Sequence, residues 1–114
     1  MNYLIVDDNT LARMSLKELV SQTNLLEYAG ECSNGTEAYQ FITSRQVDLV
    51  FLDIEMPGIT GIELMKSLPV KPIIIFTSAK KNYAVDVFDL NVADYIIKPV
   101  TPARLLEAIT KAGK

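Results

Sequence analysis

The segment at residues 49–53 constrains the fold more than any other, because a run of four apolar residues ends directly at the carboxylate of Asp53. The run is too short for a helix and too uniformly apolar for a strand with one face in water. It therefore predicts a central β-strand covered on both sides. Pro57, Gly58 and Gly61 predict an irregular loop after it. We expect Asp53 to be presented at the strand's carboxyl end rather than buried, although a single aspartate there is most often a turn or helix-cap residue.

Three more apolar runs end in polar residues. Ligands of open parallel α/β sheets bind outside the carboxyl ends of the strands, so these endings would converge on one crevice if the runs are parallel neighbours. The runs and the residues that follow them are residues 3–6 before Asp7 and Asp8, residues 73–76 before Thr77 and Ser78, and residues 95–97 before Lys98 and Pro99.

The hydrophobic pattern predicts strands and helices in alternation. Thr101 is a good N-cap and Pro102 a good first residue for the last helix. Strands are expected at residues 2–6, 26–32, 47–52, 73–76 and 95–97, and helices at residues 10–21, 36–44, 59–67, 83–90 and from 102 onward. The side chains expected to face inward are Leu11, Met14, Leu19 and Val20 in the first helix, Ala38, Phe41 and Ile42 in the second, Ala84, Val87 and Phe88 in the fourth, and Leu105, Leu106 and Ile109 in the last.

Five such alternations predict an α/β fold, a doubly wound five-stranded parallel sheet with right-handed crossovers and helices on both faces. Among the common strand orders, the (βα)5 flavodoxin-like order 2-1-3-4-5 fits best, because it places the strand of mixed polarity at residues 26–32 at an edge. It also makes the first and third strands neighbours.

Composition excludes several classes of function. The 114 residues form one domain, and Cys32 is the only cysteine, so there is no internal disulfide. The chain has no histidine, which excludes imidazole catalysis and ordinary zinc chemistry. A net charge of −3 argues against direct binding to nucleic acid. No signal peptide and no apolar run of about 20 residues is found, so we expect a cytoplasmic protein that does not enter a membrane.

The predicted crevice brings together Asp7, Asp8 and Asp53. Two carboxylates about 4 Å apart repel by roughly 4 kcal/mol at an effective dielectric constant of 20, so positive charge must be present. Lys98 supplies one charge, and a hard divalent ion such as Mg²⁺, which prefers oxygen ligands, supplies two. With the hydroxyl of Thr77, this set suits phosphoryl transfer to Asp53 as nucleophile, giving an acyl phosphate. Taken singly, these residues could instead be a helix-start pair, a strand-end threonine and a solvated lysine.

Over essentially its full length the chain resembles the receiver domain of two-component response regulators. The resemblance implies that Asp53 is the phospho-acceptor and that Asp8 and Asp53 bind Mg²⁺ directly with the backbone carbonyl of Glu55. It also implies that Asp7 acts largely through water and that Thr77 and Lys98 contact the phosphoryl group. The matching motifs are Asp7-Asp8, LDIEMPG at residues 52–58, Thr77-Ser78 and Lys98-Pro99.

The same resemblance implies a sensor histidine kinase or a phosphotransfer protein as partner. It implies a switch through Thr77 and Tyr95 that reshapes the surface of the fourth helix, fifth strand and fifth helix, where a homodimer could form. The Lys98–Pro99 peptide is expected to be cis, as in the family. The run at residues 88–99 looks most like receivers joined to LytTR-type DNA-binding domains. Candidate contact residues on the fourth helix are Tyr83, Val85 and Asp89.

The sequence ends at Lys114, directly after the fifth helix, so we expect a single receiver domain at residues 1–114 without an output domain, either stand-alone or excised. Glu55 and Ala79 occupy positions that vary among receivers and tune the lifetime of the phosphoryl group. The domain is expected to be regulatory, with self-catalysed phosphotransfer and dephosphorylation only. Two alternatives are a receiver-like interaction module that never takes phosphate and a phosphatase of the haloacid dehalogenase type, which expects a second aspartate where Glu55 stands.

Overall fold

A computed structural model describes residues 1–81, 87 and 90–113 of the chain. The described elements, in chain order, are β1 (Asn2–Val6), α1 (Thr10–Thr23), β2 (Glu27–Cys32), α2 (Gly35–Ser44), β3 (Leu49–Asp53), α3 (Gly61–Ser67), β4 (Ile73–Ser78), β5 (Asp94–Ile97) and α5 (Pro102–Ala112).

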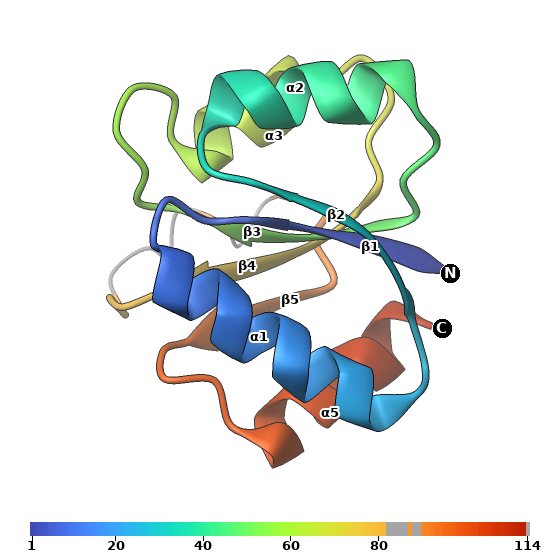
Figure 1. Ribbon diagram of the computed structural model, residues 1–114. Helices are drawn as coiled ribbons and strands as arrows, with labels where there is room; N and C mark the ends of the chain where they lie inside the picture. The colour runs from blue at the N-terminus through green and yellow to red at the C-terminus, as the bar shows by residue number, and fades with distance from the viewer. Residues whose placement is uncertain (82–86, 88–89, 114) are drawn as a thin grey trace.

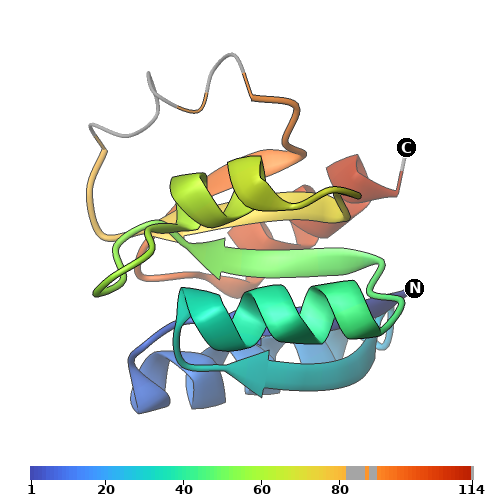
Figure 2. The same ribbon diagram turned by 90° about the horizontal axis from the view of Figure 1, so that it is seen from above.

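The five strands form one sheet in the order β2-β1-β3-β4-β5, and all four pairings are parallel. Both the order and the fold class are those predicted. Helices α2 and α3 cover one face, and α1 and α5 cover the other (Figure 1; Figure 2 shows the same layers from above). The carboxyl ends of β1, β3, β4 and β5 therefore lie at one edge of the sheet, where the polar residues follow.

Alternate residues of each strand feed two separate cores, as the two-residue period of a strand requires. In β1, Leu4 and Val6 pack with the residues under α2 and α3, and Tyr3 and Ile5 pack with those under α1 and α5. Every residue of β3 is buried, which confirms the predicted central strand. The position of β2 at an edge is also confirmed, and three of its six residues are exposed.

Cys32, the last residue of β2, is a buried free thiol. Burial is the main cause that raises the pKa of this thiol to about 11. At neutral pH the group is therefore protonated and apolar in behaviour.

The helices begin where capping residues stand. The Thr60 hydroxyl accepts the N–H of Glu63, and the Glu63 carboxylate accepts the N–H of Thr60, a reciprocal capping box at the start of α3. Thr101 caps α5, and Pro102 is its first residue, as predicted. Helix α3 begins two residues later than expected, because the loop before it runs to Thr60.

The predicted inner face of α1 is wrong in two positions. Leu11 and Met14 are 73% and 61% exposed, whereas Leu16 and Val20 are buried. At about 100° per residue, Leu11 and Met14 lie roughly 140° and 160° around the helix from Leu16, so they cannot share its face. Leu16 and Val20, four residues apart, lie on the face of α1 that packs against the sheet.

The prediction for α5 fails at one position. Leu106 is 47% exposed, because it is turned by about 100° from the buried Leu105. Ala108 and Ile109 complete the inner face at helical spacing. In α2 the expected inward residues do pack into the core: Ala38 and Ile42 are buried, and Phe41 is partly buried against them.

The expected fourth helix at residues 83–90 lies largely outside the described residues, with the predicted positions of Ala84 and Phe88 and the contact candidates Tyr83, Val85 and Asp89. Of that segment, the described Val87 is buried in the core under α3. Strand β4 is longer than predicted and includes Thr77 and Ser78. Within the described part of the chain, no helix has the length and apolar character needed to span a bilayer.

Candidate functional site

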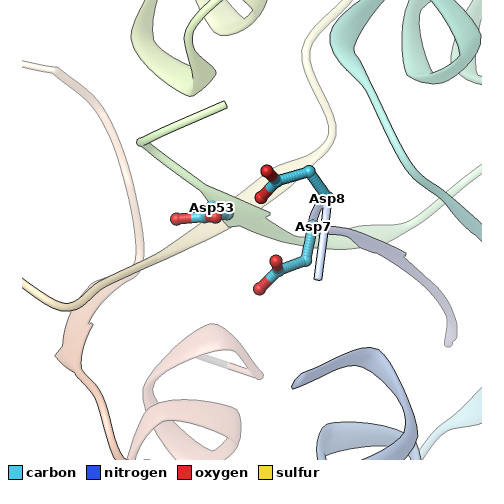
Figure 3. A group of neighbouring side chains, drawn as sticks. All are labelled: Asp7, Asp8 and Asp53. Carbon is cyan, nitrogen blue, oxygen red and sulfur yellow. The ribbon is translucent and has the colours of Figure 1, made fainter. Parts of the chain in front are cut away.

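Three aspartates meet at the carboxyl edge of the sheet (Figure 3). Asp7 and Asp8 follow β1, and Asp53 is the last residue of β3, the strand hydrogen-bonded beside it. One carboxylate oxygen of each residue lies within 4.8 Å of the other two. The convergence expected from the strand order is therefore present in the structure. Asp8 is exposed, whereas Asp7 and Asp53 are buried.

Lys98, directly after β5, reaches this cluster from the other side. Its Nζ lies 2.8 Å from Oδ2 of Asp7 and 3.6 Å from Oδ2 of Asp53. It is the only basic side chain that the described residues place within ion-pair distance of these carboxylates. The Lys98–Pro99 peptide is cis, as predicted. Lys98 therefore pairs with two of the three carboxylates, and negative charge is left over at this edge of the sheet.

Asp53 is 4% exposed, so the expectation that it would be presented rather than buried is wrong. The loop after it folds back over the strand end, and the Glu55 N–H donates to Oδ1 of Asp53 over 3.2 Å. Burial first, and then the charge of Asp7, raise the pKa of Asp53 to about 6 against the opposing effect of Lys98. Burial alone would lower the pKa of Lys98, but its hydrogen bond to Asp7 and the charge of Asp53 outweigh this and raise it.

The start of α3 packs directly on the backbone of Asp53. The Gly61 N–H donates to the carbonyl of Ile54 over 2.9 Å. A Cβ at Gly61 would lie 2.4 Å from the carbonyl oxygen of Asp53, so only glycine fits here. Gly58 has φ +78°, the left-handed conformation that glycine adopts without strain. Gly58 and Gly61, which predicted an irregular loop in the sequence, thus allow the path of the loop beside Asp53.

Thr77 lies beside Asp53, because the two residues are register partners of β4 and β3. It is buried, and its carbonyl accepts the Ile54 N–H over 3.0 Å. Tyr95 is in β5 opposite Phe76, one residue before Thr77, and is half-buried. The expected switch pair is therefore found on neighbouring strands.

Lys80 connects Tyr95 with the loop beside Asp53. The Tyr95 hydroxyl donates to the carbonyl of Lys80, and the Lys80 ammonium lies 3.1 Å from the Glu55 carboxylate. The Lys80 N–H donates to the hydroxyl of Ser78 over 3.0 Å. These contacts join the chain after β4 to the loop after β3, on either side of Asp53. No motif in the sequence indicated Lys80.

Arg13 is a second residue that the sequence analysis missed. Its guanidinium donates to the main-chain carbonyl of Asp7 over 2.7 Å and pairs with Glu31 on β2 over 2.8 Å. The pair joins residues 18 positions apart, so helical or strand periodicity could not reveal it.

The donor set fits a hard divalent cation. All three clustered side chains offer carboxylate oxygen, and neither histidine nor a nearby thiol is among them. Oxygen ligands of this kind select Mg²⁺ or a similar ion over zinc or copper. The excess negative charge, together with the raised pKa of Asp53, is what a divalent ion would relieve.

A pocket of about 390 Å³ lies beside the cluster, between α1 and the segment after β5. It is large enough for a small phosphate compound, and its lining combines charged, hydroxyl and apolar side chains. Its lining residues are Asp7, Ala12, Ser15, Leu16, Thr77, Lys98, Pro99 and Val100.

Comparison with known proteins agrees with this site. Residues 3–110 match the family described as "Response regulator receiver domain". An uncharacterised response regulatory protein of Shewanella oneidensis is 42% identical over 113 residues, which cover 97% of this chain and 48% of that protein. The transcriptional regulatory protein BtsR of Escherichia coli is 37% identical over 110 residues, covering 95% of this chain and 46% of that protein. The chain thus spans about half the length of these curated relatives.

Solved structures show the same fold. The response regulatory domain of MrkE from Klebsiella pneumoniae superposes with a TM-score of 0.89 at 33% identity, covering 99% of this chain and 95% of that one. The response regulator TrrA of Thermotoga maritima, solved in complex with Mg²⁺ and beryllium fluoride, gives a TM-score of 0.85 at 34% identity, covering 98% and 99%. The chain belongs to the response regulator receiver domain family, the regulatory domain of two-component systems.

Proposed function

We propose that the domain accepts a phosphoryl group on Asp53, with Mg²⁺, from a sensor histidine kinase or a phosphotransfer protein. The observation that carries this proposal is the convergence of three carboxylates within 4.8 Å beside the single ammonium group of Lys98. Phosphoryl transfer depends on positioning and charge neutralisation, and this arrangement offers both.

Mg²⁺ would be held by the carboxylates of Asp8 and Asp53 and by the backbone carbonyl of Glu55, with Asp7 acting largely through water. When bound, the ion supplies positive charge next to the oxygens of the transferring phosphoryl group. The complex of TrrA with Mg²⁺ and beryllium fluoride, at 34% identity, supports this assignment.

The remaining chemistry belongs to the side chains. A carboxylate oxygen of Asp53 forms a bond to phosphorus as the phosphorus–nitrogen bond of the donor histidine breaks, and the histidine nitrogen keeps the electron pair. Lys98 neutralises charge on the phosphoryl oxygens, and the Thr77 hydroxyl donates a hydrogen bond to one of them. This chemistry modifies the domain itself, and we assign the domain no other substrate.

The signal would leave through Thr77 and Tyr95. A new acyl phosphate adds negative charge and acceptor oxygens, which draw the Thr77 hydroxyl toward Asp53. Tyr95 lies on the strand beside Thr77, so its side chain can respond to that movement. The surface of β5, α5 and the segment before β5 would then change, with a homodimer as one outcome.

The wider setting is also proposed. We assign the domain to the cytoplasm, where sensor kinases expose their catalytic parts, and without direct nucleic-acid contact because of its net charge of −3. The curated relatives are about twice as long as this chain and include a transcriptional regulator. Any link to a LytTR-type DNA-binding domain belongs to such a longer protein.

The decisive experiment is incubation with acetyl phosphate and Mg²⁺, read by intact mass. We expect one phosphoryl adduct on the wild-type chain, none on Asp53→Asn, and none when EDTA removes the metal. A wild-type chain without any adduct would indicate an interaction module that takes no phosphate. Continuous release of phosphate from many substrate molecules would indicate a phosphatase. An adduct of similar yield in Asp53→Asn would place the acceptor elsewhere.

The switch is tested with Thr77→Ala. This variant should still accept phosphate on Asp53, because the acceptor and Lys98 are intact, but it should lose any change in self-association that follows phosphorylation. Sedimentation or size-exclusion chromatography with light scattering measures the change, and Tyr95→Ala should behave alike. Full retention of the change in Thr77→Ala would refute this route of coupling.

A further inference from the structure

Arg13, outside the acidic cluster, donates a hydrogen bond to its backbone. Its guanidinium is bound by acceptors from three elements. Nη1 donates to the carbonyl of Asp7 over 2.7 Å, Nε to Oε2 of Glu31 over 2.8 Å, and Nη2 to the hydroxyl of Thr10 over 3.3 Å. The side chain is only 14% exposed. Arg13 is therefore fixed between the end of β1, strand β2 and the first turn of α1.

The carbonyl that Arg13 holds belongs to the peptide unit that joins Asp7 to Asp8. The preceding N–H of Asp7 donates to the carbonyl of Cys32 over 3.1 Å, and Oδ1 of Asp7 accepts the Asn9 N–H over 2.9 Å. Hydrogen bonds thus hold both the N–H and the carbonyl of Asp7. The orientation of that carbonyl sets the direction in which the chain continues to Asp8. Asp7 thus gains its orientation from several contacts at once.

Asp8 has no such support of its own. Its side chain is exposed, and no hydrogen bond or ion pair within the described residues holds it. The place of its carboxylate beside Asp53 therefore depends on the backbone that carries it. Arg13 is the only side chain in the described part of the chain that bonds to the carbonyl of that peptide unit.

Glu31 holds Arg13 in turn. One of its carboxylate oxygens accepts from Arg13 Nε, and the other accepts from the Tyr28 hydroxyl over 3.0 Å. Both Glu31 and Tyr28 lie on β2, the edge strand. A polar chain thus runs from the surface of the edge strand, through Glu31 and Arg13, to the Asp7–Asp8 peptide.

We propose that Arg13, anchored by Glu31, is a positioning residue for the metal site: it holds the Asp7–Asp8 peptide so that the Asp8 carboxylate can bind Mg²⁺ together with Asp53. This inference rests on the proposed function, which assigns Mg²⁺ to these carboxylates. It adds a residue from α1 and a residue from β2 to the determinants of metal affinity.

The sign of the effect separates position from charge. Arg13 carries a positive charge close to the acidic cluster, so by electrostatics alone its removal should strengthen the binding of a cation. If Arg13 acts by holding the peptide, its removal should weaken binding, as the loss of supporting contacts around metal ligands does. The two roles therefore predict opposite changes in the dissociation constant of Mg²⁺.

The test is a calorimetric titration of the chain with MgCl₂. Arg13→Met should weaken Mg²⁺ binding by roughly tenfold, the lower end of the effect seen for residues that support metal ligands. Arg13→Lys should recover part of the affinity, because a lysine can donate to the Asp7 carbonyl but lacks the fork that also reaches Glu31. Glu31→Gln, which keeps the shape but weakens the anchor, should reduce affinity by a smaller factor.

Lys17→Met is the matched control. Lys17 lies one turn further along α1, over the ring of Tyr28 at 4.0 Å from its centroid, and its replacement removes the same charge without touching the Asp7 carbonyl. We expect its affinity for Mg²⁺ to equal or slightly exceed that of the wild type. Affinity in Arg13→Met that matches Lys17→Met would overturn the proposal.

Two further cases are an Arg13→Met variant that does not fold and a failure of the proposed function itself. If Arg13→Met does not fold, Arg13→Lys and Glu31→Gln carry the test, and wild-type affinity in both would overturn the proposal. Failure of the proposed function gives a different result: the wild type would not bind Mg²⁺, or Asp8→Asn would bind it as well as the wild type does. Binding that Asp8→Asn weakens, with unchanged affinity in the Arg13 and Glu31 variants, would refute only the role of Arg13.

Discussion

Asp53 and Asp94 both stand at strand ends with side chains only 6% and 8% exposed, yet their surroundings are opposite. Asp94, at the start of β5, receives two hydrogen bonds of 2.7 Å from Arg104, lies 3.3 Å from the ammonium of Lys111 and accepts the Tyr95 N–H. Asp53, at the end of β3, shares Lys98 with Asp7, and the Asp8 carboxylate lies close to both acids. Asp94 is therefore paired with two cations, whereas Asp53 shares a single cation with another carboxylate.

The pKa values follow this difference. Burial raises the pKa of either acid, but around Asp94 the hydrogen bonds of Arg104, the Tyr95 N–H and Lys111 outweigh burial and bring the pKa below its ordinary value. Around Asp53 burial and the charge of Asp7 prevail, and the pKa rises to about 6. The carboxylate of Asp94, whose charge is balanced by two cations of α5, joins α5 to β5. An unbalanced carboxylate is destabilising unless a ligand binds, and such sites are typically functional.

The largest effect should come from breaking the balanced site. Asp94→Asn leaves Arg104 and Lys111 with only the exposed Glu107 as counter-charge, and we expect a loss of about 3 kcal/mol in the free energy of unfolding, as for other ion pairs whose buried partner is removed. Urea unfolding followed by circular dichroism measures the loss. Glu107→Gln is the control, because the exposed Glu107 only flanks Arg104 and Lys111, and its loss should be at most about 0.5 kcal/mol. Equal losses in the two variants would contradict the comparison.

The same substitution at Asp53 should have the opposite sign. Without metal, Asp53→Asn removes a buried charge that Asp7 and Asp8 repel. We expect it to stabilise the protein by roughly 2 to 3 kcal/mol at pH 7.5, because the pKa of Asp53 is raised by about two units and each unit corresponds to about 1.4 kcal/mol. Unfolding in EDTA measures this gain. A loss of stability in Asp53→Asn under these conditions would show that Lys98 compensates the site fully.

The gain should depend on pH with a defined sign. Asp53 has a pKa near 4 when unfolded and about 6 when folded, so the folded state binds more protons between these values. Wild-type stability in EDTA should therefore fall relative to Asp53→Asn as the pH rises from 4 to about 6, and the difference should be constant above about 7. For Asp94 the lowered pKa gives the reverse: its contribution is present above about pH 4 and is lost as the pH falls through the folded value.

A smaller effect should come from the ligand itself. Mg²⁺ at ten times its dissociation constant should stabilise the wild type by about 1.4 kcal/mol, because it binds the folded state only. Thermal unfolding with and without MgCl₂ measures the shift. The double variant with Asp7→Asn and Asp8→Asn should show none. A shift of wild-type size in the double variant would place the metal elsewhere and would leave the acidic cluster without its proposed ligand.

The strand order and the acidic cluster were predictable because both depend on patterns that are local in the sequence. Each strand appears as a short apolar run, and each site residue stands within two positions of the end of such a run. The topology of a parallel sheet then brings the ends together. The structure brings Asp7, Asp8, Asp53 and Lys98 together for this reason.

The errors concern information that is not local. Leu11, Met14 and Leu106 are apolar but exposed, because they lie around their helices from the buried residues and apolar character alone did not mark the buried side. The burial of Asp53 depends on how the following loop folds back. The pairs Arg13–Glu31 and Asp94–Arg104 join different elements, and neither leaves a periodic signal in the sequence.

Gly61 brings the start of α3 against the end of β3. Since the space between this residue and the Asp53 carbonyl holds a hydrogen atom but no methyl group, the first turn of α3 and the end of β3 are in direct backbone contact. The Gly61 N–H bond to Ile54 ties the same two segments together. A displacement of the Asp53 backbone by a few tenths of an ångström cannot be absorbed by side-chain rotation, and the helix must move with it. Helix α3 is thereby coupled to the backbone of Asp53 from the face of the sheet opposite α1 and α5.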